Sequence, residues 1–330
     1  MIRRKRTVEE KLKILILIRP FDMSYPKHRP KFETIRTIEK YAEVKYWYTN
    51  GNIHEIMETL NFTPDFILHY DMAYSYALAP YISGLDQVDI PKGCFVIDSH
   101  FSPTTRSHYF ESNKIDLIFS STKSHFLKTY PKYADKFRWF PFSINTKIFK
   151  DYNLEKDINF LLMGLVFDGT EENGYKSMTP KGIYPFRDEV LRRMRNVEGF
   201  VYHPHPGHNA GENALVNENY AKELNRAKMF FTCGSEFKYP VLKYFEAPAC
   251  KTLLLAEPVP DIYELGFKDG ENFVACDRSN FYEKAMYYLE NESERIRITE
   301  NGYKFIHTEH TDDARAQNFV REVRNFIESK

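Results

Sequence analysis

The sequence predicts an α/β protein made of two Rossmann-like domains that face a cleft. Short β-rich runs alternate with helical patterns through the first half of the chain, which is typical of βαβ units and a parallel sheet. The same alternation restarts after residue 150. A length of 330 residues agrees with two domains, because one domain usually holds roughly 100–200 residues.

The predicted elements of the first half alternate in type along the chain. Leu12 to Ile18 is an apolar run typical of a buried strand, and Lys31 to Tyr41 has the spacing of a helix. We predict further strands at 44–48, 66–70, 94–98 and 117–120, and a second helix at 53–60. Pro141 to Phe149 then interrupts this rhythm, so we place the domain boundary near residue 150.

The second half repeats the pattern. Ile158 to Met163 is a predicted strand that ends in Gly164, and Arg315 to Ile327 is a predicted amphipathic helix. The remaining strands are predicted at 199–202, 229–232 and 273–276, and the remaining helices at 186–194, 220–226 and 282–289. One further helix is predicted to begin at Pro240.

The charge balance argues against a polyanionic partner. Lysine and arginine together number 46, as do aspartate and glutamate, so the formal net charge is zero. Such a chain creates no overall field that attracts nucleic acid, and we predict no stable nucleic-acid partner. Four basic residues form a small patch near the N-terminus: Arg3, Arg4, Lys5 and Arg6. This patch is predicted either to touch a membrane surface weakly or to be a solvated chain end.

The cysteines and the apolar runs indicate a cytoplasmic protein without a transmembrane segment. Four cysteines occur without C-x-x-C spacing, which favours buried free thiols over a zinc site. The longest apolar run, Leu12 to Ile18, is interrupted by Lys13 and is far shorter than a membrane span. Arg19 and Pro20 follow this run, where a signal peptide would have small residues.

The segment from Tyr239 to Asp277 carries the clearest functional pattern. Residues at i, i+4 and i+8 spacing define a core-facing side of its helix: Val241, Phe245 and Ala249. Lys243 and Glu246 lie three residues apart on another side. A helix N-terminus with a lysine suits a diphosphate, and a glutamate one turn further along can accept hydrogen bonds from ribose hydroxyls. The alternative is an ordinary amphipathic helix packed on a sheet.

This segment resembles the donor-binding motif of GT-B glycosyltransferases, and most closely that of the CgeB-like group. In the motif, a helix of the form K/R-x-x-E-A-x-A-C-G precedes a hydrophobic strand and an E-L-x-x-x-G-x-N loop. Two positions depart from it, because Lys251 replaces the usual glycine and Lys238 replaces the first glutamate of an E-x7-E pair. The matching residues are Lys243, Glu246, Ala247, Ala249, Cys250, Glu264, Leu265, Gly270 and Asn272.

The resemblance implies a set of donor-binding residues around this helix. Glu246 would hold the ribose of the nucleotide, while Lys243 and the backbone of residues 236–243, which includes Tyr239, would bind the diphosphate. Lys238 would add a positive charge, and Glu236 would partly replace the missing glutamate. The alternative for this run is a plain turn between a strand and a helix.

Gly164 and the run Tyr184 to Arg187 resemble the F-x-G … Y-P-x-R opening of the donor domain. Glycine allows a backbone to approach a phosphate closely. Arg187 would neutralise charge on the diphosphate. The alternative is a surface arginine paired with Asp188 or Glu189.

Polar residues follow the predicted strand at 94–98. Ligands in open α/β sheets bind at the carboxyl ends of the strands, so Asp98 and His100 are the candidate catalytic residues, with Arg106 and His108 close behind. Either candidate could accept the proton of an acceptor hydroxyl. The alternative is that Asp98 caps the next helix and His100 makes only a local hydrogen bond.

No metal site is predicted. His203, His205 and His208 are closely spaced, but no nearby cysteine or carboxylate completes an obvious ligand set. The resemblance implies that no cofactor or metal is needed, since basic side chains and a helix dipole neutralise the leaving diphosphate. No convincing D-x-D manganese motif is present.

Together these observations predict a metal-independent glycosyltransferase of GT-B architecture that uses a nucleotide-sugar, with UDP-sugar the first choice. Residues 1–150 would form the acceptor side, 151–310 the donor domain, and 311–330 a helix crossing back to the N-terminal domain. The resemblance suggests retention of anomeric configuration, although the altered E-x7-E pair leaves the stereochemistry open. The alternatives are a GT-B-fold sugar-nucleotide epimerase and a non-catalytic nucleotide-sugar-binding scaffold. Acceptor loops vary, so the sequence does not identify the acceptor.

Overall fold

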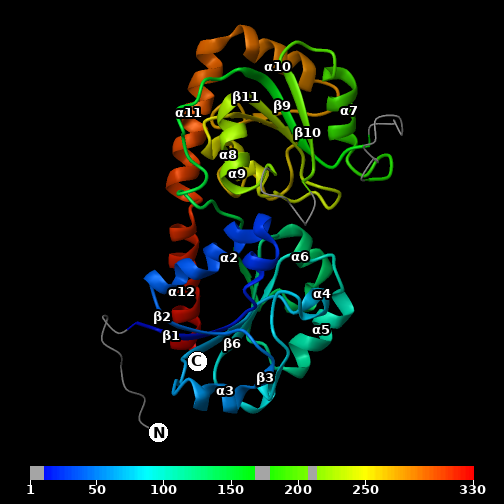
Figure 1. Cartoon of the computed structure of the whole chain (residues 1–330). Helices are drawn as coiled ribbons and strands as arrows, with labels where there is room; N and C mark the ends of the chain where they lie inside the picture. The colour runs from blue at the N-terminus through cyan, green and yellow to red at the C-terminus, as the bar shows by residue number, and fades with distance from the viewer. Residues whose placement is uncertain (1–10, 168–178, 207–213) are drawn as a thin grey trace. The chain divides into compact units, whose positions relative to one another are not determined.

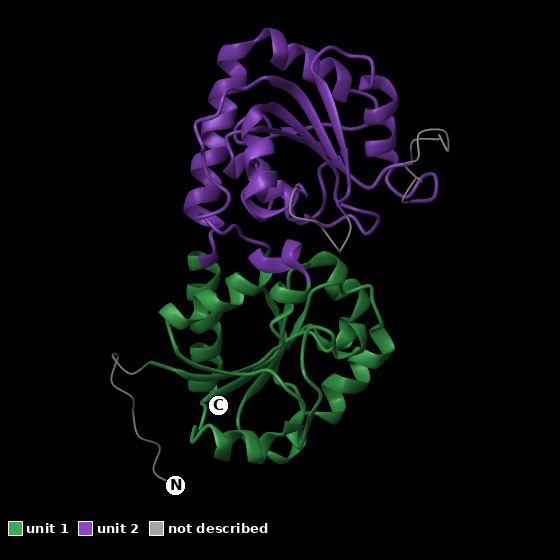
Figure 2. Ribbon diagram, in the orientation of Figure 1, with its two compact units in different colours: residues 1–24, 31–141, 313–330 green, residues 25–30, 142–312 purple. Residues whose placement is uncertain are grey.

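The structure of the protein is a computed structural model, which describes residues 11–167, 179–206 and 214–330 (Figure 1). The chain forms two compact units (Figure 2). Unit 1 contains residues 1–24, 31–141 and 313–330, and unit 2 contains residues 25–30 and 142–312. The basic patch from Arg3 to Arg6 lies outside the described residues.

Unit 1 is built on a six-stranded sheet in the order β2-β1-β4-β6-β7-β8, and every neighbouring pair is parallel. The strands are β1 (Lys13–Leu17), β2 (Glu43–Trp47), β4 (Phe66–His69), β6 (Lys92–Val96), β7 (Leu117–Ser120) and β8 (Phe137–Trp139). Two short strands, β3 (Gly51–Asn52) and β5 (Ile82–Ser83), pair beside this sheet. The near-continuous apolar strands fit a sheet that is covered on both faces.

Helices cover both faces of the unit 1 sheet. One face packs with α3 (Ile53–Thr59), α5 (Pro103–Ser112) and α6 (Ser124–Thr129). On the other face, Phe319 of α12 (Asp312–Ser329) contacts the rings of Phe66 and Phe119. The remaining short helices of this part of the chain are α1 (Phe21–Ser24), α2 (Arg29–Arg36) and α4 (Ala73–Tyr76).

Unit 2 contains a second parallel sheet, in the order β10-β9-β11-β12-β13. Its strands are β9 (Ile158–Gly164), β10 (Phe200–Pro204), β11 (Ala227–Thr232), β12 (Leu253–Ala256) and β13 (Val274–Ala275). One face packs against α7 (Pro185–Met194) and α10 (Phe281–Glu290). The other packs against α8 (Asn217–Arg226), α9 (Lys243–Ala249) and α11 (Glu292–Glu309). The predicted fold class, an α/β protein with two parallel-sheet domains, is confirmed.

Two sequence expectations about helices in unit 2 were wrong. Helix α9 begins at Lys243, so Pro240 lies before the helix, and a different proline, Pro248, lies inside its last turn. The 18-residue helix α11 was not predicted at all. It packs on α9 through Gly302, where a Cβ atom would lie 2.6 Å from the Asn272 carbonyl oxygen. The buried face of α11 combines Ile298 and Ile306 with Arg295, Thr299 and Gly302, so its apolar pattern is weak.

Within the described residues, no helix has both the length and the apolar character needed to cross a membrane. All four cysteines are buried and free, in agreement with the sequence expectation. No disulfide therefore contributes to the stability of either unit.

Candidate functional site

Two cationic side chains converge on the end of strand β9 in unit 2. Gly164 ends this strand with φ +139°. A Cβ atom there would lie 2.6 Å from Lys243 Nζ and 3.1 Å from Arg187 Nη1. The two nitrogen atoms are therefore within about 6 Å of each other, a distance at which like charges repel appreciably. Glycine suits this position because residues with a side chain rarely adopt this φ, and an added Cβ atom would crowd both cations.

Lys243, in the first turn of α9, has an unusual protonation equilibrium. Its ammonium group donates a hydrogen bond to the Met163 carbonyl oxygen, which belongs to β9. Burial, together with the nearby Arg187 guanidinium, lowers the pKa of Lys243 to about 7. The side chain is therefore only partly charged at neutral pH.

Arg187, in the first turn of α7, is buried with only 5% of its surface exposed. Its guanidinium carbon lies 4.6 Å from the centre of the Tyr184 ring, which gives a cation–π contact. Its Nε is buried without a hydrogen-bond partner, and among the described residues the guanidinium forms no ion pair. The alternative, a surface arginine paired with Asp188 or Glu189, is contradicted, because Arg187 is buried, Asp188 accepts from Phe167 N and Glu189 binds Arg192.

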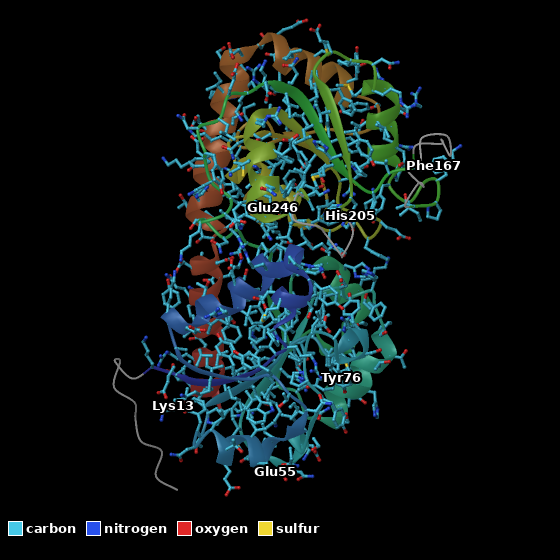
Figure 3. All side chains as sticks on the ribbon, in the orientation of Figure 1. Lys13, Glu55, Tyr76, Phe167, His205 and Glu246 are labelled. Carbon is cyan, nitrogen blue, oxygen red and sulfur yellow. The ribbon has the colours of Figure 1, made fainter. Side chains whose placement is uncertain are left out.

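Glu246 lies one turn along α9 from Lys243 and is 7% exposed. The negative charge of Glu246 raises the pKa of Lys243, and so offsets part of the lowering caused by burial and by Arg187. Burial and the Glu246 charge raise the pKa of Tyr220, whose hydroxyl is buried without a hydrogen-bond partner. Figure 3 labels Glu246 on α9 and His205 after β10, at the same end of unit 2.

The turn before α9 is less clearly part of this site. Lys238 forms an ion pair with Glu257, with 3.0 Å between Nζ and Oε2, so part of its charge is neutralised within the turn. Glu236 is exposed, and Tyr239 is buried with its N–H donating to Gly234 O. The structure thus brings Gly164, Arg187 and Lys243 together, with Glu246 beside them. Lys238, Glu236 and Tyr239 lie in the turn before α9 and do not join this group.

The closely spaced histidines have separate partners. His203 Nε2 lies 2.7 Å from Glu223 Oε1, and His205 Nε2 lies 3.4 Å from Lys27 Nζ. His208 lies outside the described residues. In the part of the chain that the structure describes, no group of three or more His, Cys, Asp or Glu side chains is arranged to hold a metal ion.

In unit 1, a buried ion pair organises the carboxyl ends of β4 and β6. Arg106 Nη2 lies 2.6 Å from Asp71 Oδ2, and both side chains are at most 1% exposed. Asp71 also accepts hydrogen bonds from Ile97 N and Ala73 N. Arg106 Nη1 donates to the carbonyl oxygens of Asp98 and Phe101. This ion pair therefore fixes the turn that contains Asp98 and His100.

Asp98 receives a hydrogen bond from the Tyr74 hydroxyl. Burial alone would raise the pKa of Asp98, but Lys31, the Tyr74 hydrogen bond, His100 and Arg106 together hold it below its ordinary value. The carboxylate is thus ionised at neutral pH. It does not cap helix α5, whose N-cap residue is Ser102.

His100 lies next to a second polar group. Its ring centroid is 6.1 Å from that of His125, and His125 Nδ1 lies 2.6 Å from Ser99 Oγ. Ser99 also contacts Thr122 at 2.9 Å. These side chains come from the ends of β6 and β7, as expected for a ligand site in an open parallel sheet. The exposed His108 has no comparable neighbours in the described structure.

Sequence reasoning missed several of these residues. Asp71, Tyr74 and His125 lie far from Asp98 in sequence, and only the order of the strands brings them to the same edge. For Asp71, its place immediately after β4 was an available signal. Tyr220 had no signal, because a buried tyrosine without a partner looks like core in the sequence.

Solved structures with the same architecture are glycosyltransferases or related enzymes. They include a glycosyltransferase from Rickettsia africae (12% identity, 97% of this chain and 100% of that chain, TM-score 0.61). Sucrose-phosphate synthase from Thermosynechococcus elongatus matches at 11% identity over 97% of this chain and 100% of its own, with a TM-score of 0.59. HepE from Anabaena, in complex with UDP and glucose, matches at 11% identity over 95% of this chain and 99% of its own, with a TM-score of 0.55. Identities this low establish the fold alone.

The family whose description is glycosyl transferase-like matches residues 187–321. The chain therefore has the GT-B fold, and residues 187–321 resemble the glycosyl transferase-like family. The matched region begins at Arg187 and includes Lys243 and Glu246. No match was found among curated protein sequences. Membership of the CgeB-like subgroup stays a prediction.

The Asp71–Arg106 ion pair gives a first prediction. The substitution Asp71→Asn leaves a buried guanidinium without its counter-charge, which typically costs about 3–5 kcal/mol of folding free energy. Both tryptophans of the chain, Trp47 and Trp139, are in unit 1. Urea unfolding followed by tryptophan fluorescence therefore reports this unit, and the transition should move to markedly lower urea.

The matched control is Glu111→Gln, which removes the exposed ion pair with Lys132 on the same sheet face. This variant should unfold at the wild-type urea concentration, since exposed ion pairs contribute little. An Asp71→Asn transition at the wild-type position would contradict the organising role of the buried pair.

Proposed function

We propose that this protein is a glycosyltransferase that moves a sugar from a UDP-sugar to an acceptor hydroxyl, without a metal ion. Unit 2 binds the donor, and unit 1 binds the acceptor. The proposal rests above all on Arg187 and Lys243, two buried cations beside Gly164 that have no ion-pair partner among the described residues. The proposal extends to retention of anomeric configuration, which rests on the sequence resemblance alone.

The energetics of these two cations favour an anionic ligand. Two like charges about 6 Å apart repel by about 3 kcal/mol at the effective dielectric typical of proteins. A buried charge also loses its hydration, which is normally compensated by a counter-ion. Burial and the Arg187 charge lower the pKa of Lys243 to about 7, so loss of this proton would relieve part of the cost in the unliganded protein. An anion would relieve it more completely.

A nucleoside diphosphate is the anion that fits the surrounding residues. A diphosphate offers enough oxygen atoms to accept from both the Arg187 fork and the Lys243 ammonium group. The buried Glu246 carboxylate, one helical turn away, is suited to accept hydrogen bonds from ribose hydroxyls. HepE, which shares this fold, was solved in complex with UDP and glucose. UDP is therefore the nucleotide that we propose.

The same cations would assist the reaction. When the bond from the anomeric carbon to the donor oxygen breaks, negative charge develops on the leaving diphosphate. Fixed positive groups in a desolvated site stabilise that charge without any reorganisation. Arg187 and Lys243 supply this positive charge from protein side chains. For this reason we propose that the reaction needs no metal ion.

For the acceptor side, we assign Asp98 and His100 as the groups that receive the hydroxyl proton. Asp98 is ionised at neutral pH and is held in place by Tyr74. The Arg106 guanidinium fixes the backbone carbonyl of Asp98. Both features favour a carboxylate with a defined orientation, as general-base chemistry requires.

The proposed activity is tested by incubating the protein with UDP-, GDP- and TDP-sugars and measuring free nucleotide. Nucleotide release that requires an added acceptor supports transfer. Isomerisation of the donor would instead identify the epimerase. Binding without turnover would identify a scaffold.

Removing either cation should weaken UDP binding. Each charge-assisted contact is worth roughly 1.5–3 kcal/mol, so Arg187→Gln and Lys243→Met should each raise the Kd for UDP by roughly 10- to 100-fold. Isothermal titration calorimetry measures this change. Scanning calorimetry without UDP should show no loss of stability for Lys243→Met, because the substitution also removes a like-charge repulsion.

Arg192→Gln is the matched control for Arg187→Gln. Arg192 lies on the same helix α7 but is exposed and paired with Glu189. This control should bind UDP with the wild-type Kd. Wild-type UDP affinity in either Arg187→Gln or Lys243→Met would show that the cation pair does not bind the diphosphate.

UDP affinity should also depend on pH through Lys243. The free protein binds this proton with a pKa of about 7, and a bound diphosphate favours the protonated form. Affinity is therefore greatest below pH 7 and falls as the pH rises through that value, by about tenfold between pH 7 and pH 8.5. Titration calorimetry in two buffers of different ionisation enthalpy should show proton uptake on binding at pH 8.

The variant Lys243→Met separates this effect from titration of the UDP β-phosphate. Its affinity should be lower but nearly constant above pH 7, and proton uptake at pH 8 should disappear. Equal proton uptake in the wild type and the variant would assign the pH dependence to another group.

Glu246→Ala should weaken UDP binding by several-fold to tenfold through loss of the ribose contact. A double-mutant cycle with 2′,3′-dideoxy-UDP tests this contact directly. The wild type should prefer UDP over the dideoxy analogue, whereas Glu246→Ala should bind both alike. If the folded variant kept the full preference for UDP, Glu246 would not hold the ribose.

A further inference from the structure

The exposed apolar side chains of unit 1 are gathered at one edge of its sheet. Four large apolar or aromatic side chains are exposed in the described part of this unit: Met23 (81%), Tyr48 (42%), Tyr81 (53%) and Phe101 (39%). Met23, Tyr48 and Phe101 lie in segments that follow β1, β2 and β6. Tyr81 lies in the connection from β4 to β5, where its N–H donates to Asn50, a residue that follows β2. Single exposed apolar residues are ordinary, but their concentration at one edge is not.

The opposite edge of the same sheet has a different chemistry. The first residues of the strands, or those immediately before them, are charged there: Lys13, Glu43, Asp65, Lys92, Asp116 and Lys136. The exposed aromatic rings are therefore specific to the carboxyl edge, where open α/β sheets bind their ligands.

Each exposed ring at this edge is supported by a second ring. Phe101 stacks on Tyr74 with 4.4 Å between centroids and 13° between planes. Tyr81 packs edge-on against Tyr76 at 5.5 Å, and Tyr48 stacks on Tyr46 at 6.0 Å. A ring that is backed in this way keeps one orientation, which lowers the entropy lost when a ligand binds.

The backbone under these rings is strained. Tyr74, Ser75 and Tyr76 all have left-handed φ angles, of 60°, 52° and 60°. Arg19 Nε holds this turn by donating to the Tyr76 carbonyl oxygen at 2.9 Å. Consecutive left-handed residues with side chains are costly, and such strain is concentrated at functional sites.

Polar groups lie among the rings. Asp98 accepts from Tyr74, the residue that stacks on Phe101. Asn50 Oδ1 accepts from Tyr81 N at 2.8 Å and from Arg19 Nη2 at 2.9 Å. The edge thus combines rigid aromatic faces with hydrogen-bonding groups.

From these features we infer that the acceptor is an oligosaccharide or polysaccharide chain, lying across the carboxyl edge of unit 1 with its sugar rings against Phe101, Tyr81 and Tyr48. A pyranose has a C–H face that packs on an aromatic ring and a rim of hydroxyls that bind carboxylates and amides. From β2 to β6 are three strand spacings, or about 14 Å, which is longer than one sugar ring. The inference rests on the proposed function, since it identifies the acceptor of that reaction.

The test begins with the full chain, fluorescently labelled, on an array of defined mono- to hexasaccharides with peptide and lipid spots for comparison. Titration calorimetry then gives the Kd of the best soluble oligosaccharide in the presence of UDP. Phe101→Leu and Tyr81→Leu should each raise this Kd about five- to tenfold. A trisaccharide should bind at least about tenfold more tightly than its monosaccharide unit.

The matched control is Tyr287→Leu, which removes a tyrosine ring of similar exposure (51%) from α10 in unit 2. It should leave the Kd for the oligosaccharide unchanged. Tryptophan fluorescence unfolding of Phe101→Leu and Tyr81→Leu should match the wild type, which separates loss of the ring from loss of the fold.

The inference is overturned if UDP binds but no glycan does, if only peptide or lipid spots bind, or if both ring variants keep the wild-type Kd. Equal affinity for a monosaccharide and its trisaccharide would also overturn it. Failure of the proposed function has a different signature. In that case UDP itself does not bind, while glycan binding that is lost in Phe101→Leu would still support the glycan surface.

Discussion

Arg187 and Lys243 are buried against the same glycine of unit 2, and their mutual repulsion is the constraint around which this end of the unit is built. The Met163 carbonyl oxygen and the Tyr184 ring each compensate one cation in part. Gly164 makes the arrangement possible because it has no side chain. Within the described residues, no carboxylate forms an ion pair with either cation. The protein therefore tolerates an unfavourable charge pair that a bound anion would stabilise, as is common where binding is favoured over stability.

In unit 1, by contrast, the buried arginine forms an ion pair with a buried carboxylate. Arg106 is fully compensated by Asp71, and its remaining donors hold the backbone at Asp98 and Phe101. Here the charge supports the structure and is not available to a ligand. What this edge offers is the orientation that the ion pair imposes: an ionised Asp98 beside Tyr74, and aromatic rings fixed by their neighbours. The two units thus use buried arginine for different purposes, one for the ligand and one for the scaffold.

Much of this could be read from the sequence, and the failures have physical causes. Parallel strands such as Ile158 to Gly164 are continuous apolar runs, so their positions were predicted closely. Gly164, Arg187 and Lys243 were named from short motifs, but that they share one site depends on tertiary packing. Helix α11 was missed because three of its five buried residues, Arg295, Thr299 and Gly302, are not typical of an apolar face. Asp71 was missed because its partner, Arg106, is 35 residues away in sequence, and only the strand order brings them together.

A crystal structure of the protein with UDP tests the central claim most directly. The account predicts electron density for the diphosphate within hydrogen-bonding distance of the Arg187 guanidinium and of Lys243 Nζ, next to Gly164, with the ribose hydroxyls at Glu246. A nucleotide bound elsewhere, with Arg187 and Lys243 still lacking an anion, would contradict it.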